Sequence, residues 1–497
     1  MKTAWSDGMR WAKPLSDLGH DLPITIPADT AGLVISDIVE DTRDVTPGSL
    51  FVARPGKRFD GRQFIQQAET AGAVAILSDA EGCAKASVPA VACDDPGMVS
   101  IHFADRLFES PTESMPIVAV TGTNGKTTTA TFLQHLLGPG TGLISSIEID
   151  DTRERSPARL TTPAPLELRR IMARMRANQC HRVVMEASSH GIALGRLAEL
   201  DIMGAIFTNL SGDHLDFHGT MDAYIAAKRA LFAGLRPPAF SVVNLDDPLA
   251  RVMSAASPVP PLGCRLHTTG PTDVHVEYDV QGTVRLNSDW AMTETPLLMP
   301  GAHNAMNLAQ AFAAAFACDV IPSQETLASL PAPRGRLEPV GPAGNGAQVF
   351  VDFAHTDEAL ETALSALRPL VVEGGRLRVV FGCGGDRDRS KRPRMGSVAS
   401  RLADSIHVTS DNPRSESPDA IIQDILTGVS SRKDVVIEPD RAAAIATAIK
   451  ESQAGDVVLI AGKGHECAQL IGDQVLPFDD RLVAQEIIAA QGGALSA

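Results

Sequence analysis

Short apolar runs and amphipathic segments alternate along most of this 497-residue chain. Apolar and β-branched runs predict strands, and apolar residues spaced three or four positions apart predict helices. In the first part, strands are predicted at 32–38, 49–54 and 73–77, and a helix at 63–71. This alternation predicts an α/β fold in which helices cover both faces of parallel sheets.

The middle and last parts repeat the alternation. In the middle, strands are predicted at 182–185, 202–207 and 241–244, and helices at 166–178, 221–232 and 301–317, with a less regular stretch before the last helix. In the last part, strands are predicted at 348–353, 377–381, 406–408 and 456–460, and helices at 358–370, 396–403, 420–429 and 442–451. We expect 456–460 to be the last strand. The Pro- and Gly-rich stretch 331–336 has the composition of a hinge.

One stretch predicts a nucleotide site. The apolar run that starts at Ile117 ends in Thr121-Gly122-Thr123-Asn124-Gly125-Lys126-Thr127-Thr128, and a helical pattern follows at once. A strand, a glycine-containing turn and a helix N-terminus present unpaired backbone N–H groups to an anion. Lys126 can reach a terminal phosphate, and the Thr127 hydroxyl can bind magnesium. Val120 stands where the usual Walker A loop has its first glycine, and the alternative is an ordinary strand-to-helix turn.

Composition and charge narrow the class of protein. The length suggests about two to four domains, and 44% hydrophobic with 21% charged residues is typical of a globular chain. A net charge of −16 argues against nucleic acid or an anionic membrane as a partner. No run approaches the roughly 18 apolar residues of a membrane span, residues 1–18 lack the apolar core of a secretory signal, and seven scattered cysteines indicate reduced thiols. We therefore expect a cytoplasmic protein without membrane insertion.

Polar residues also follow two other predicted strands of the middle part. Glu186 comes directly after one strand, and Asp213-His214-Leu215-Asp216 comes shortly after the next. Ligands of open α/β sheets collect at such strand ends. Glu186 suits magnesium, whereas His214 is an unusual ligand for so hard a cation, and a structural hydrogen-bonding role is its alternative. A zinc pair of His214 and His218 would lack a third ligand.

Two sets of basic residues have ordinary interpretations. Lys57, Arg58 and Arg62 lie near two glycines in a polar loop, for which a solvated basic loop is the simplest interpretation. Lys228 lies on an amphipathic helix, where a lysine is by default solvated or salt-bridged.

Three polar clusters follow predicted strands in the last part: Gly382–Arg389, Asp411–Arg414 and Gly462–Glu466. Glycines let the backbone approach a ligand, and arginines offer planar forks for a carboxylate or phosphate. Each cluster alone is compatible with a tight turn. Three of them at the carboxyl ends of one sheet favour a shared ligand crevice.

Together these motifs resemble the Mur ligase superfamily. The resemblance rests on the loop 121–128, on Glu186-Ala187-Ser188-Ser189-His190-Gly191, on Asp213–Asp216 with Lys228, and on 301–307, 334–336, 352–356 and 382–389, and it extends to Glu466. Within the superfamily, Asp411-Asn412-Pro413-Arg414 is similar to the signature of ligases that add meso-diaminopimelate to UDP-N-acetylmuramoyl-L-alanyl-D-glutamate in peptidoglycan synthesis.

The resemblance implies three domains and one reaction. The domains would be a small α/β UDP-binding domain (1–113), a central P-loop-type ATPase domain with a mostly parallel sheet (114–334) and a C-terminal Rossmann-like domain that receives the amino acid (335–497). ATP, with Mg²⁺, would phosphorylate the D-glutamyl carboxylate, and the incoming amine would attack the acyl phosphate. Because like charges repel in the first step, cations and backbone donors would do most of the catalysis. We expect a monomer.

The resemblance also implies the site residues. ATP would be held by Gly122, Thr123, Asn124, Gly125, Lys126, Thr127, Thr128, Asn304, Arg336 and Asp352, and Mg²⁺ by Thr127, Glu186 and His214. The UDP-substrate would be held by Thr42, Lys57, Arg58, Phe59, Thr161, Thr162, Ser188 and Arg196, and diaminopimelate by Arg387, Asp411, Asn412, Pro413, Arg414, Gly462 and Glu466. The implied catalytic residues are Lys126, Glu186, His214 and Lys228.

Two of these roles have a clear physical basis. Arg414 can pair bidentately with the distal carboxylate that lysine lacks, and Glu466 can pair with the distal ammonium. Lys228 matches the family position that reacts with carbon dioxide to form a carbamate, N6-carboxylysine. That reaction needs the neutral amine, and since an unperturbed lysine has a pKa of about 10.4, burial or nearby positive charge must favour deprotonation.

Four positions depart from the family pattern: Thr42 replaces a serine, Leu194 a glutamine that contacts substrate in some relatives, Phe353 a tyrosine and Asp357 a proline. Three alternatives remain. A lysine-adding relative usually lacks the arginine that ends Asp-Asn-Pro-Arg. A folylpolyglutamate-type ligase shares the phosphate loop, but the N-terminal domain argues against it. A catalytically silent nucleotide-binding protein would not need Lys126, Glu186, His214 and Lys228 together.

Overall fold

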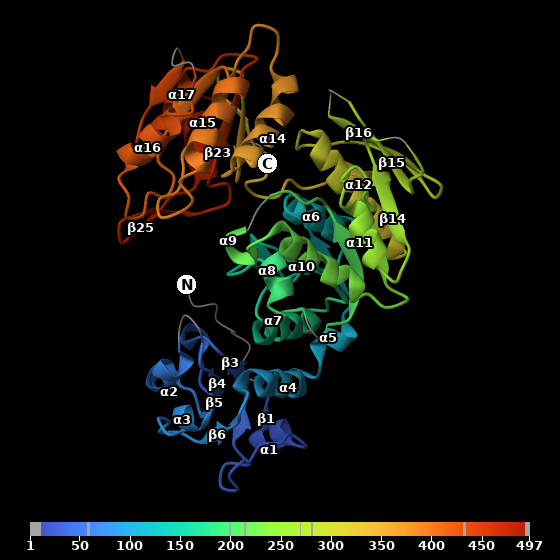
Figure 1. Ribbon diagram of the computed structural model, residues 1–497, viewed down its shortest axis with the longest axis vertical. Coiled ribbons are helices and arrows are strands. Elements are labelled where there is room, and N and C mark those ends of the chain that lie inside the picture. Colours follow the sequence, from blue (N-terminus) through green and yellow to red (C-terminus); the bar gives the residue numbers. More distant parts are fainter. Residues whose placement is uncertain are drawn as a thin grey trace. The chain divides into compact units, whose positions relative to one another are not determined.

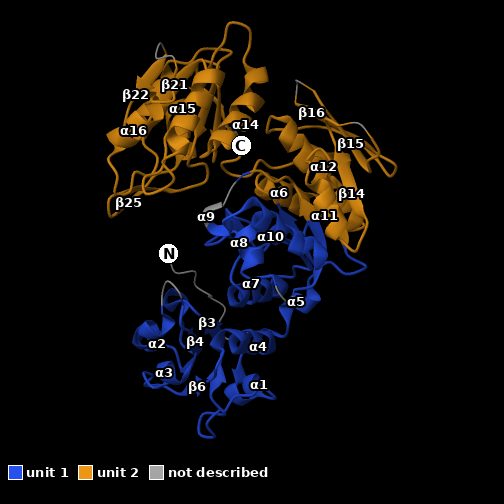
Figure 2. Ribbon diagram, viewed as in Figure 1, with its two compact units in different colours: residues 1–121, 138–205, 212–239 blue, residues 122–137, 206–211, 240–497 orange. Residues whose placement is uncertain are grey.

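The computed structural model describes residues 11–56, 60–197, 200–212, 215–268, 270–279, 282–430 and 434–492. Four predicted site residues lie outside these ranges, Lys57, Arg58, Phe59 and His214, as does Asp213 of the motif that contains His214. The chain divides into two units (Figure 2): unit 1 takes residues from 1–121, 138–205 and 212–239, and unit 2 takes residues from 122–137, 206–211 and 240–497. Within the described part of the chain, no helix is long and apolar enough to cross a membrane.

Unit 1 begins with a small parallel sheet (Figure 1). Its strands, in spatial order, are β3 (Asp37–Val39), β4 (Ser49–Ala53), β5 (Ala75–Ser78) and β6 (Ala90–Ala92). Successive residues of β4 point to opposite faces. Leu50 and Val52 share a core with α4 (Pro96–Phe108), whereas Phe51 and Ala53 share one with α2 (Ile65–Ala71). The sheet is therefore apolar on both faces, as parallel strands require.

Shorter elements complete this first part of unit 1. They are β1 (Lys13–Pro14), α1 (Leu15–Gly19), β2 (Val34–Ile35), the 3₁₀ turns η1 (Thr42–Asp44) and η2 (Gly61–Phe64), α3 (Ala80–Cys83) and α5 (Pro111–Ser114). The predicted strand 32–38 is thus split into β2 and β3, and the predicted strands 49–54 and 73–77 are confirmed as β4 and β5.

The rest of unit 1 contains a second group of strands. β7 (Ile117–Thr121), β8 (Thr141–Ile144) and β11 (Arg182–Glu186) are parallel, with β11 between the other two. β9 (Glu148–Asp150) and β10 (Arg155–Pro157) extend them antiparallel. The helices are α7 (Pro165–Ala177), α8 (Ser189–Ala193), α9 (Leu215–His218) and α10 (Met221–Ala233). β12 (Ile202–Phe207) is divided between the two units.

Helix α7 packs with the N-terminal part of unit 1. Leu166 and Ala173 of α7 lie in the same core as Leu50 and Phe103. The predicted boundary at 113/114 therefore falls inside unit 1, and the domain limits remain a prediction.

In unit 2, α6 (Lys126–Leu137) packs against α12 (Ala302–Ala317). β13 (Phe240–Asn244), β14 (Pro261–Arg265) and β15 (Val274–Tyr278) are parallel, and β16 (Thr283–Ser288) and β17 (Met292–Pro296) continue antiparallel. α11 (Ala250–Ala256) and α13 (Gln324–Ala328) complete this part. The stretch before α12, predicted to be irregular, is thus largely strand.

The last part of unit 2 is a twisted sheet with helices on both faces (Figure 1). Its order is β18 (Glu338–Pro342), β19 (Gln348–Asp352), β23 (Val457–Ala461), β20 (Leu377–Phe381), β21 (Ser405–Val408) and β22 (Val435–Ile437), with only the edge strand β18 antiparallel among these six. Its helices are α14 (Asp357–Leu367) with the 3₁₀ turn η3 (Arg368–Leu370), α15 (Lys391–Leu402), α16 (Pro418–Leu426), α17 (Arg441–Lys450) and α18 (Asp480–Ala490).

The two faces of this sheet are covered by different helices. Val379 and Phe381 share a core with α14, α15 and α16, whereas Val380 shares one with α17 and α18. The predicted α/β arrangement is confirmed.

Two predictions for this part are wrong. α15 begins at Lys391 rather than 396, because Pro393 lies in its first turn, where a missing N–H costs nothing. Strand 456–460 is not the last: the hairpin of β24 (Ala468–Ile471) and β25 (Gln474–Pro477) follows it, and then α18.

Candidate functional site

The phosphate-type loop joins β7 to α6, as the sequence predicts. Gly122 and Gly125 both have positive φ angles, +155° and +82°. A Cβ atom on Gly122 would collide with Thr208 Oγ1, and one on Gly125 would lie 2.5 Å from Asn307 Oδ1. Both glycines are therefore required by close approach, and the loop fits an anion-binding cradle.

The segment after β12 braces this loop. Asn209 Oδ1 accepts from Asn124 N (2.9 Å), Thr208 Oγ1 donates to Asn124 O (2.6 Å), and Ser211 N donates to Thr123 Oγ1 (3.0 Å). Lys126 Nζ donates to Gly122 O (3.0 Å) and Thr123 O (2.8 Å). The polar run that follows β12 thus fixes the conformation of the loop.

In unit 2, Arg336 lies near this loop, and Asp352 lies near Arg336. Arg336 Nη2 lies 3.5 Å from Thr127 Oγ1, and its guanidinium carbon lies 5.1 Å from the centre of the Phe353 ring. The Asp352 carboxylate accepts from Leu337 N (2.7 Å) and Ala354 N (2.8 Å), while burial raises its pKa. Phe353, one of the departures from the family pattern, therefore supports Arg336 through its ring face.

Asn304 lies on α12. Its Nδ2 donates to Pro300 O (2.9 Å), and its Oδ1 accepts from Asn307 Nδ2 (3.3 Å). Because Asn307 also touches Gly125, the two asparagines link α12 to the loop.

In unit 1, Glu186 is fully buried at the end of β11. Its Oε1 accepts from Ser146 N (2.8 Å), and its Oε2 has no hydrogen-bond partner among the described residues. A buried carboxylate oxygen left without a donor is costly, and oxygen is the ligand that Mg²⁺ prefers. The residue therefore fits a role as a cation ligand. The described residues contain no group of three or more His, Cys, Asp or Glu side chains placed to hold a metal.

Lys228 is also buried in unit 1, at 1% exposure. It lies on α10, which packs against α8, and its Nζ is 4.7 Å from the centre of the Tyr224 ring. The interpretation as a solvated cation is wrong because this face of α10 is covered.

Three predicted residues, Glu186, Ser188 and Arg196, meet around Thr162. Thr162 Oγ1 donates to Glu186 O (2.9 Å) and accepts from Ser188 N (2.9 Å), while Arg196 Nη1 donates to Thr162 O (2.6 Å). Burial lowers the pKa of Arg196. The structure thus joins the predicted substrate residues Thr162, Ser188 and Arg196 to the predicted metal ligand.

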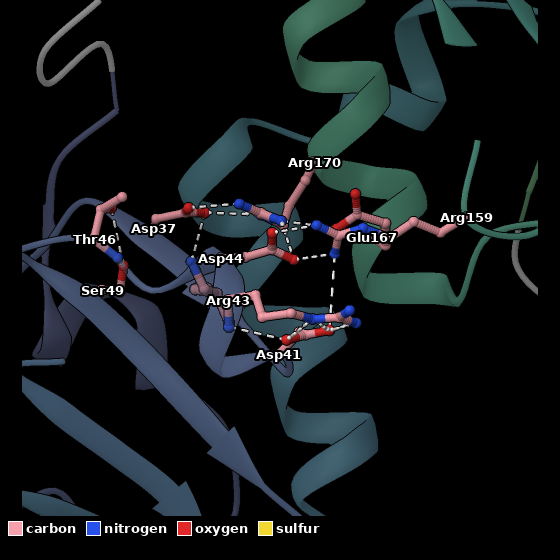
Figure 3. Close-up of polar contacts among 10 residues, drawn as sticks. Asp37, Asp41, Arg43, Asp44, Thr46, Ser49, Arg159, Glu167 and Arg170 are labelled. Carbon is pink, nitrogen blue, oxygen red and sulfur yellow. Dashed lines mark hydrogen bonds and ion pairs between the residues drawn. The ribbon is translucent and has the colours of Figure 1, made fainter. Parts of the chain in front are cut away.

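Thr42 is tied to this region by an ion pair, which Figure 3 shows. Arg159 donates to both oxygens of Asp44, at 2.6 and 2.8 Å, across 115 residues of sequence. Asp44 lies in the same 3₁₀ turn as Thr42, and Arg159 immediately precedes Leu160 and the predicted contacts Thr161 and Thr162. We call this pair the Arg159–Asp44 junction.

A second, buried pair lies beside the junction. Arg170 of α7 donates to both oxygens of Asp37 in β3, at 3.0 and 2.8 Å, and to Glu167 at 2.7 Å (Figure 3). Arg170 is 3% exposed, and its neighbouring carboxylates raise its pKa against the effect of burial. Sequence analysis missed Asp37, Asp44, Arg159 and Arg170, since no local spacing links residues so far apart.

A small cavity lies where β3 and β4 end, next to Glu40 and Arg54. It has a volume of about 190 Å³, and Glu40, Arg54, Asp95 and Met98 are among its lining residues. Arg54 Nε lies 3.1 Å from Glu40 Oε1, yet burial raises the pKa of Glu40.

Arg62, predicted to be solvated, instead pairs with Asp60 and Asp79, at 2.7 and 3.1 Å.

In unit 2, the loops after β20, β21 and β23 come together, as predicted. Asn412 Nδ2 donates to Glu466 Oε2 (2.8 Å), Arg414 Nη1 donates to Gly385 O (2.8 Å), and a Cβ atom on Gly462 would lie 3.3 Å from Asp411 Oδ2. We call these loops the C-terminal cluster: Gly382–Arg389, Asp411–Arg414 and Gly462–Glu466.

Other predicted residues of the C-terminal cluster take different positions. Gly385 packs directly against the Pro413 carbonyl, and Arg387 is exposed. Asp411 is buried, which raises its pKa, and its Oδ1 has no hydrogen-bond partner within the described ranges. This oxygen lies 3.8 Å from Lys463 Nζ, so the nearest cation to it belongs to the protein.

Two residues that sequence analysis did not single out support the C-terminal cluster. Arg441 makes two 2.7 Å contacts with Asp480 and donates to Ala461 O (2.9 Å), so it anchors the end of β23. Both side chains are fully buried. No motif marks them, because each lies on a helix remote from the loops in sequence.

Comparison with known proteins supports one family over the whole chain. Profiles match in order: Mur ligase family, catalytic domain, over residues 34–109; Mur ligase middle domain over 120–315; and Mur ligase, glutamate ligase domain, over 335–464. A UDP-N-acetylmuramoyl-L-alanyl-D-glutamate–2,6-diaminopimelate ligase of Solibacter usitatus is 40% identical over 488 residues, which cover 95% of this chain and 97% of the relative.

Solved structures agree. The structure of a UDP-N-acetylmuramoyl-L-alanyl-D-glutamate–2,6-diaminopimelate ligase is 31% identical, with a TM-score of 0.63, and covers 97% of this chain and 99% of its own. A MurF ligase from Thermotoga maritima in complex with ADP shares the fold at 20% identity, a TM-score of 0.64, and coverage of 92% and 96%. A folylpolyglutamate synthase from Mycobacterium tuberculosis is more distant, at 19% identity, a TM-score of 0.57, and coverage of 73% and 92%.

Proposed function

The chain belongs to the Mur ligase family, and we propose that it is the ATP-dependent ligase that adds meso-diaminopimelate to UDP-N-acetylmuramoyl-L-alanyl-D-glutamate in peptidoglycan synthesis. The observation that carries the proposal is nearly full-length similarity to ligases of that name, in a chain whose Arg414 and Glu466 lie in one cluster. The folylpolyglutamate-type alternative is less well supported, because the folylpolyglutamate synthase structure matches a smaller share of this chain.

The phosphate loop would bind ATP. The loop Gly122–Thr128 leads into the N-terminus of α6, which attracts anions, and Lys126 supplies the cation for the transferred phosphate. Within the loop, Thr123 N and Asn124 N donate to Asn209. Asn304, Arg336 and Asp352 are proposed contacts to the rest of the nucleotide. The position of Arg336 beside Thr127 supports this assignment.

Mg²⁺ would be held by Thr127, Glu186 and His214, of which His214 lies outside the described residues. When bound, it would neutralise phosphate charge as the substrate carboxylate approaches. The unpartnered buried oxygen of Glu186 supports its part in this set.

The UDP-substrate would span unit 1. Thr42, Thr161, Thr162, Ser188 and Arg196 are its proposed contacts there, and the hydrogen bonds around Thr162 pre-organise three of them. Lys57, Arg58 and Phe59 remain predictions on residues that the structure does not describe.

The amino acid would bind at the C-terminal cluster. Arg414 would pair with the distal carboxylate of diaminopimelate, and Glu466 and Asp411 would attract its ammonium groups. Asn412, Arg387, Pro413 and Gly462 are the other proposed contacts. This arrangement gives meso-diaminopimelate two ionic contacts at its distal centre, of which L-lysine can make only one.

Lys228 is proposed as the carbamate site. Burial supports this because it penalises the ammonium form, and carbamate formation requires the neutral amine. The carbamate would place a negative charge where it can orient a cation. Lys228→Ala is expected to lose activity and to recover part of it with a short-chain carboxylate. Full activity in that variant would remove the proposal.

The decisive experiment measures phosphate release with ATP, Mg²⁺ and UDP-N-acetylmuramoyl-L-alanyl-D-glutamate, with meso-diaminopimelate or L-lysine in parallel reactions. We expect turnover with meso-diaminopimelate alone. Turnover with L-lysine would retain the ligase and overturn the role of Arg414, and no turnover with either would overturn the proposed reaction.

A monomeric state and a cytoplasmic location also stay predictions; light scattering and cell fractionation would test them.

A further inference from the structure

Lys463 occupies the centre of the C-terminal cluster without being one of the proposed ligand contacts. Its side chain is fully buried, and its Nζ donates to Asn412 Oδ1 (3.1 Å), Glu466 Oε2 (3.1 Å) and Ala468 O (2.6 Å). A lysine ammonium has three N–H groups. Since all three are used within the protein, Lys463 has no donor left for a substrate.

These bonds fix two proposed contacts of the amino acid. The carbonyl oxygen of the Asn412 side chain accepts from Lys463, so its amide nitrogen must face Glu466, to which it donates at 2.8 Å. Glu466 Oε2 therefore receives two donors. The Glu466 side chain is still 37% exposed, so a ligand ammonium can reach the carboxylate.

Strand β24 holds the neighbouring loop along its length. Gln469 Nε2 donates to Asp411 O (2.8 Å), and Leu470 N donates to Asn412 Oδ1 (3.0 Å). Arg414 N donates to Leu470 O (3.0 Å), and Gly472 N donates to Arg414 O (2.7 Å). Every residue of Asp411–Arg414 except Pro413 is thus bonded to β24 or the glycine that follows it.

Arg414 explains why such support is needed. Its φ angle is +51°, a left-handed conformation that is unfavourable for a residue with a side chain. Two hydrogen bonds to the backbone of β24 and its turn hold it there. The hairpin therefore holds the backbone from which the Arg414 side chain extends, and the guanidinium donates to Gly385 O.

We propose that Lys463 and strand β24 are positioning elements of the amino-acid subsite, with Lys463 aligning Asn412 and Glu466 and with Gln469 and Leu470 shaping the loop that carries Arg414. The inference rests on the proposed function. Lys463 touches no substrate; it acts through the side chains that do. The competing account is a lysine that only stabilises the domain, which would alter all substrates or none.

The test compares Lys463→Met with Lys450→Met. Methionine has a similar length without donors, and Lys450 is an exposed lysine at the end of α17 in the same sheet-and-helix part. In Lys463→Met, we expect the KM for meso-diaminopimelate to rise about tenfold or more. The KM values for ATP and the UDP-substrate should stay within about twofold. Lys450→Met should match the unmodified protein.

A second variant covers the case in which Lys463→Met does not fold. Gln469→Met removes one donor to Asp411 O while keeping the length of the side chain, and it should raise the same KM by a smaller factor. Unchanged KM values, or equal rises for all three substrates, in the variants that fold would overturn the inference.

Hydrogen exchange separates this inference from the proposed function. In folded Lys463→Met, peptides that contain Leu470 and Arg414 should exchange faster than in Lys450→Met, because the loop and β24 lose a shared partner. This readout requires no turnover. If the unmodified protein does not use diaminopimelate but exchange still rises, the proposed function fails and the structural role of Lys463 stands; unchanged exchange would refute that role.

Discussion

The Arg159–Asp44 junction and the C-terminal cluster each hold together loops that are distant in sequence, but they do so by different means. At the junction, one arginine pairs with one carboxylate, and Arg159 remains 51% exposed. In the C-terminal cluster, the central side chain, Lys463, is fully buried; its Nζ donates to two neutral oxygen atoms and to Glu466, and it lies 3.8 Å from Asp411 Oδ1. The first arrangement is an ion pair with a half-exposed arginine, and the second is a fully buried cation held by neutral acceptors as well as carboxylates.

This difference determines whether salt or the removal of one bonding partner should weaken each region more. Exposed ion pairs are screened by salt and contribute little to stability. Buried donors and acceptors are costly when one partner is removed, because the other is left unsatisfied. The pair beside the junction is an example of the second case, since Arg170 is buried in its pair with Asp37.

The largest effect is expected at the buried arginine of unit 1. Arg170→Met leaves Asp37 buried without its partner, and breaking such a pair typically costs about 3–5 kcal/mol. Thermal unfolding should show a clear drop in Tm. Arg285→Met is the matched control, because both partners of the Arg285–Glu294 pair are exposed, at 46% and 56%. Equal shifts in both variants would contradict the distinction between buried and exposed pairs.

Arg414→Ala tests the ligand side of the C-terminal cluster. Without the guanidinium, the distal carboxylate of diaminopimelate would lose its partner, at a cost of about 2–5 kcal/mol. Steady-state kinetics should show a sharply raised KM for diaminopimelate and little change for ATP. Arg401→Ala, which removes an exposed arginine on α15, serves as control. Unchanged amino-acid kinetics in Arg414→Ala would refute the role of Arg414.

Acid should affect the C-terminal sheet through His407. Burial lowers the pKa of this histidine from 6.5 to about 4, so the unfolded chain binds a proton that the folded chain does not. Stability is therefore lost as pH falls from about 6.5 towards 4, by about 1.4 kcal/mol for this group at about pH 5.5.

His407→Gln should reduce that acid sensitivity, which unfolding curves at about pH 7.5 and 5.5 can measure. His275→Gln replaces an exposed histidine and should leave the acid sensitivity unchanged. If His407→Gln loses as much stability on acidification as the unmodified protein, His407 is not the group responsible.

The smallest effect is expected at the junction itself. Arg159→Ala should change stability by at most about 1 kcal/mol. The KM for the UDP-substrate should rise by a few-fold, because Thr42 and Thr162 lose their link. The rise should diminish at high salt, where the pair is already screened. Combining Arg159→Asp with Asp44→Arg should recover part of the affinity; no recovery would contradict an ion-pair mechanism.

Much of the C-terminal cluster could be predicted because its strands are wholly apolar and its polar loops follow them directly. β20 and β23 are buried at every position, so each strand end was visible in the sequence. The hairpin after β23 could not be seen, because β25 is exposed at every position and carries no alternation. β15 did carry a signal: Val274 and Val276 are buried, whereas His275 and Glu277 are exposed.

The ion pairs could not be predicted from the sequence, for a different reason. Nothing in the spacing of charged residues pairs Arg159 with Asp44 or Arg170 with Asp37, because the fold alone brings them together. Lys463 lay inside a motif that the sequence did reveal. Its role still could not be inferred, since that role depends on the acceptors Asn412 Oδ1 and Ala468 O.

The packing of α7 limits how the protein can be recombined with its relatives. Leu166 and Ala173 cover Phe103 and Leu50 of the N-terminal core, although α7 follows the phosphate loop in sequence. A chimaera that exchanges only residues 1–113 would join one parent's α4 to the other parent's α7. Such a graft should fold well only where the two parents match at the α4–α7 contact, because residues in contact do not contribute independently to stability.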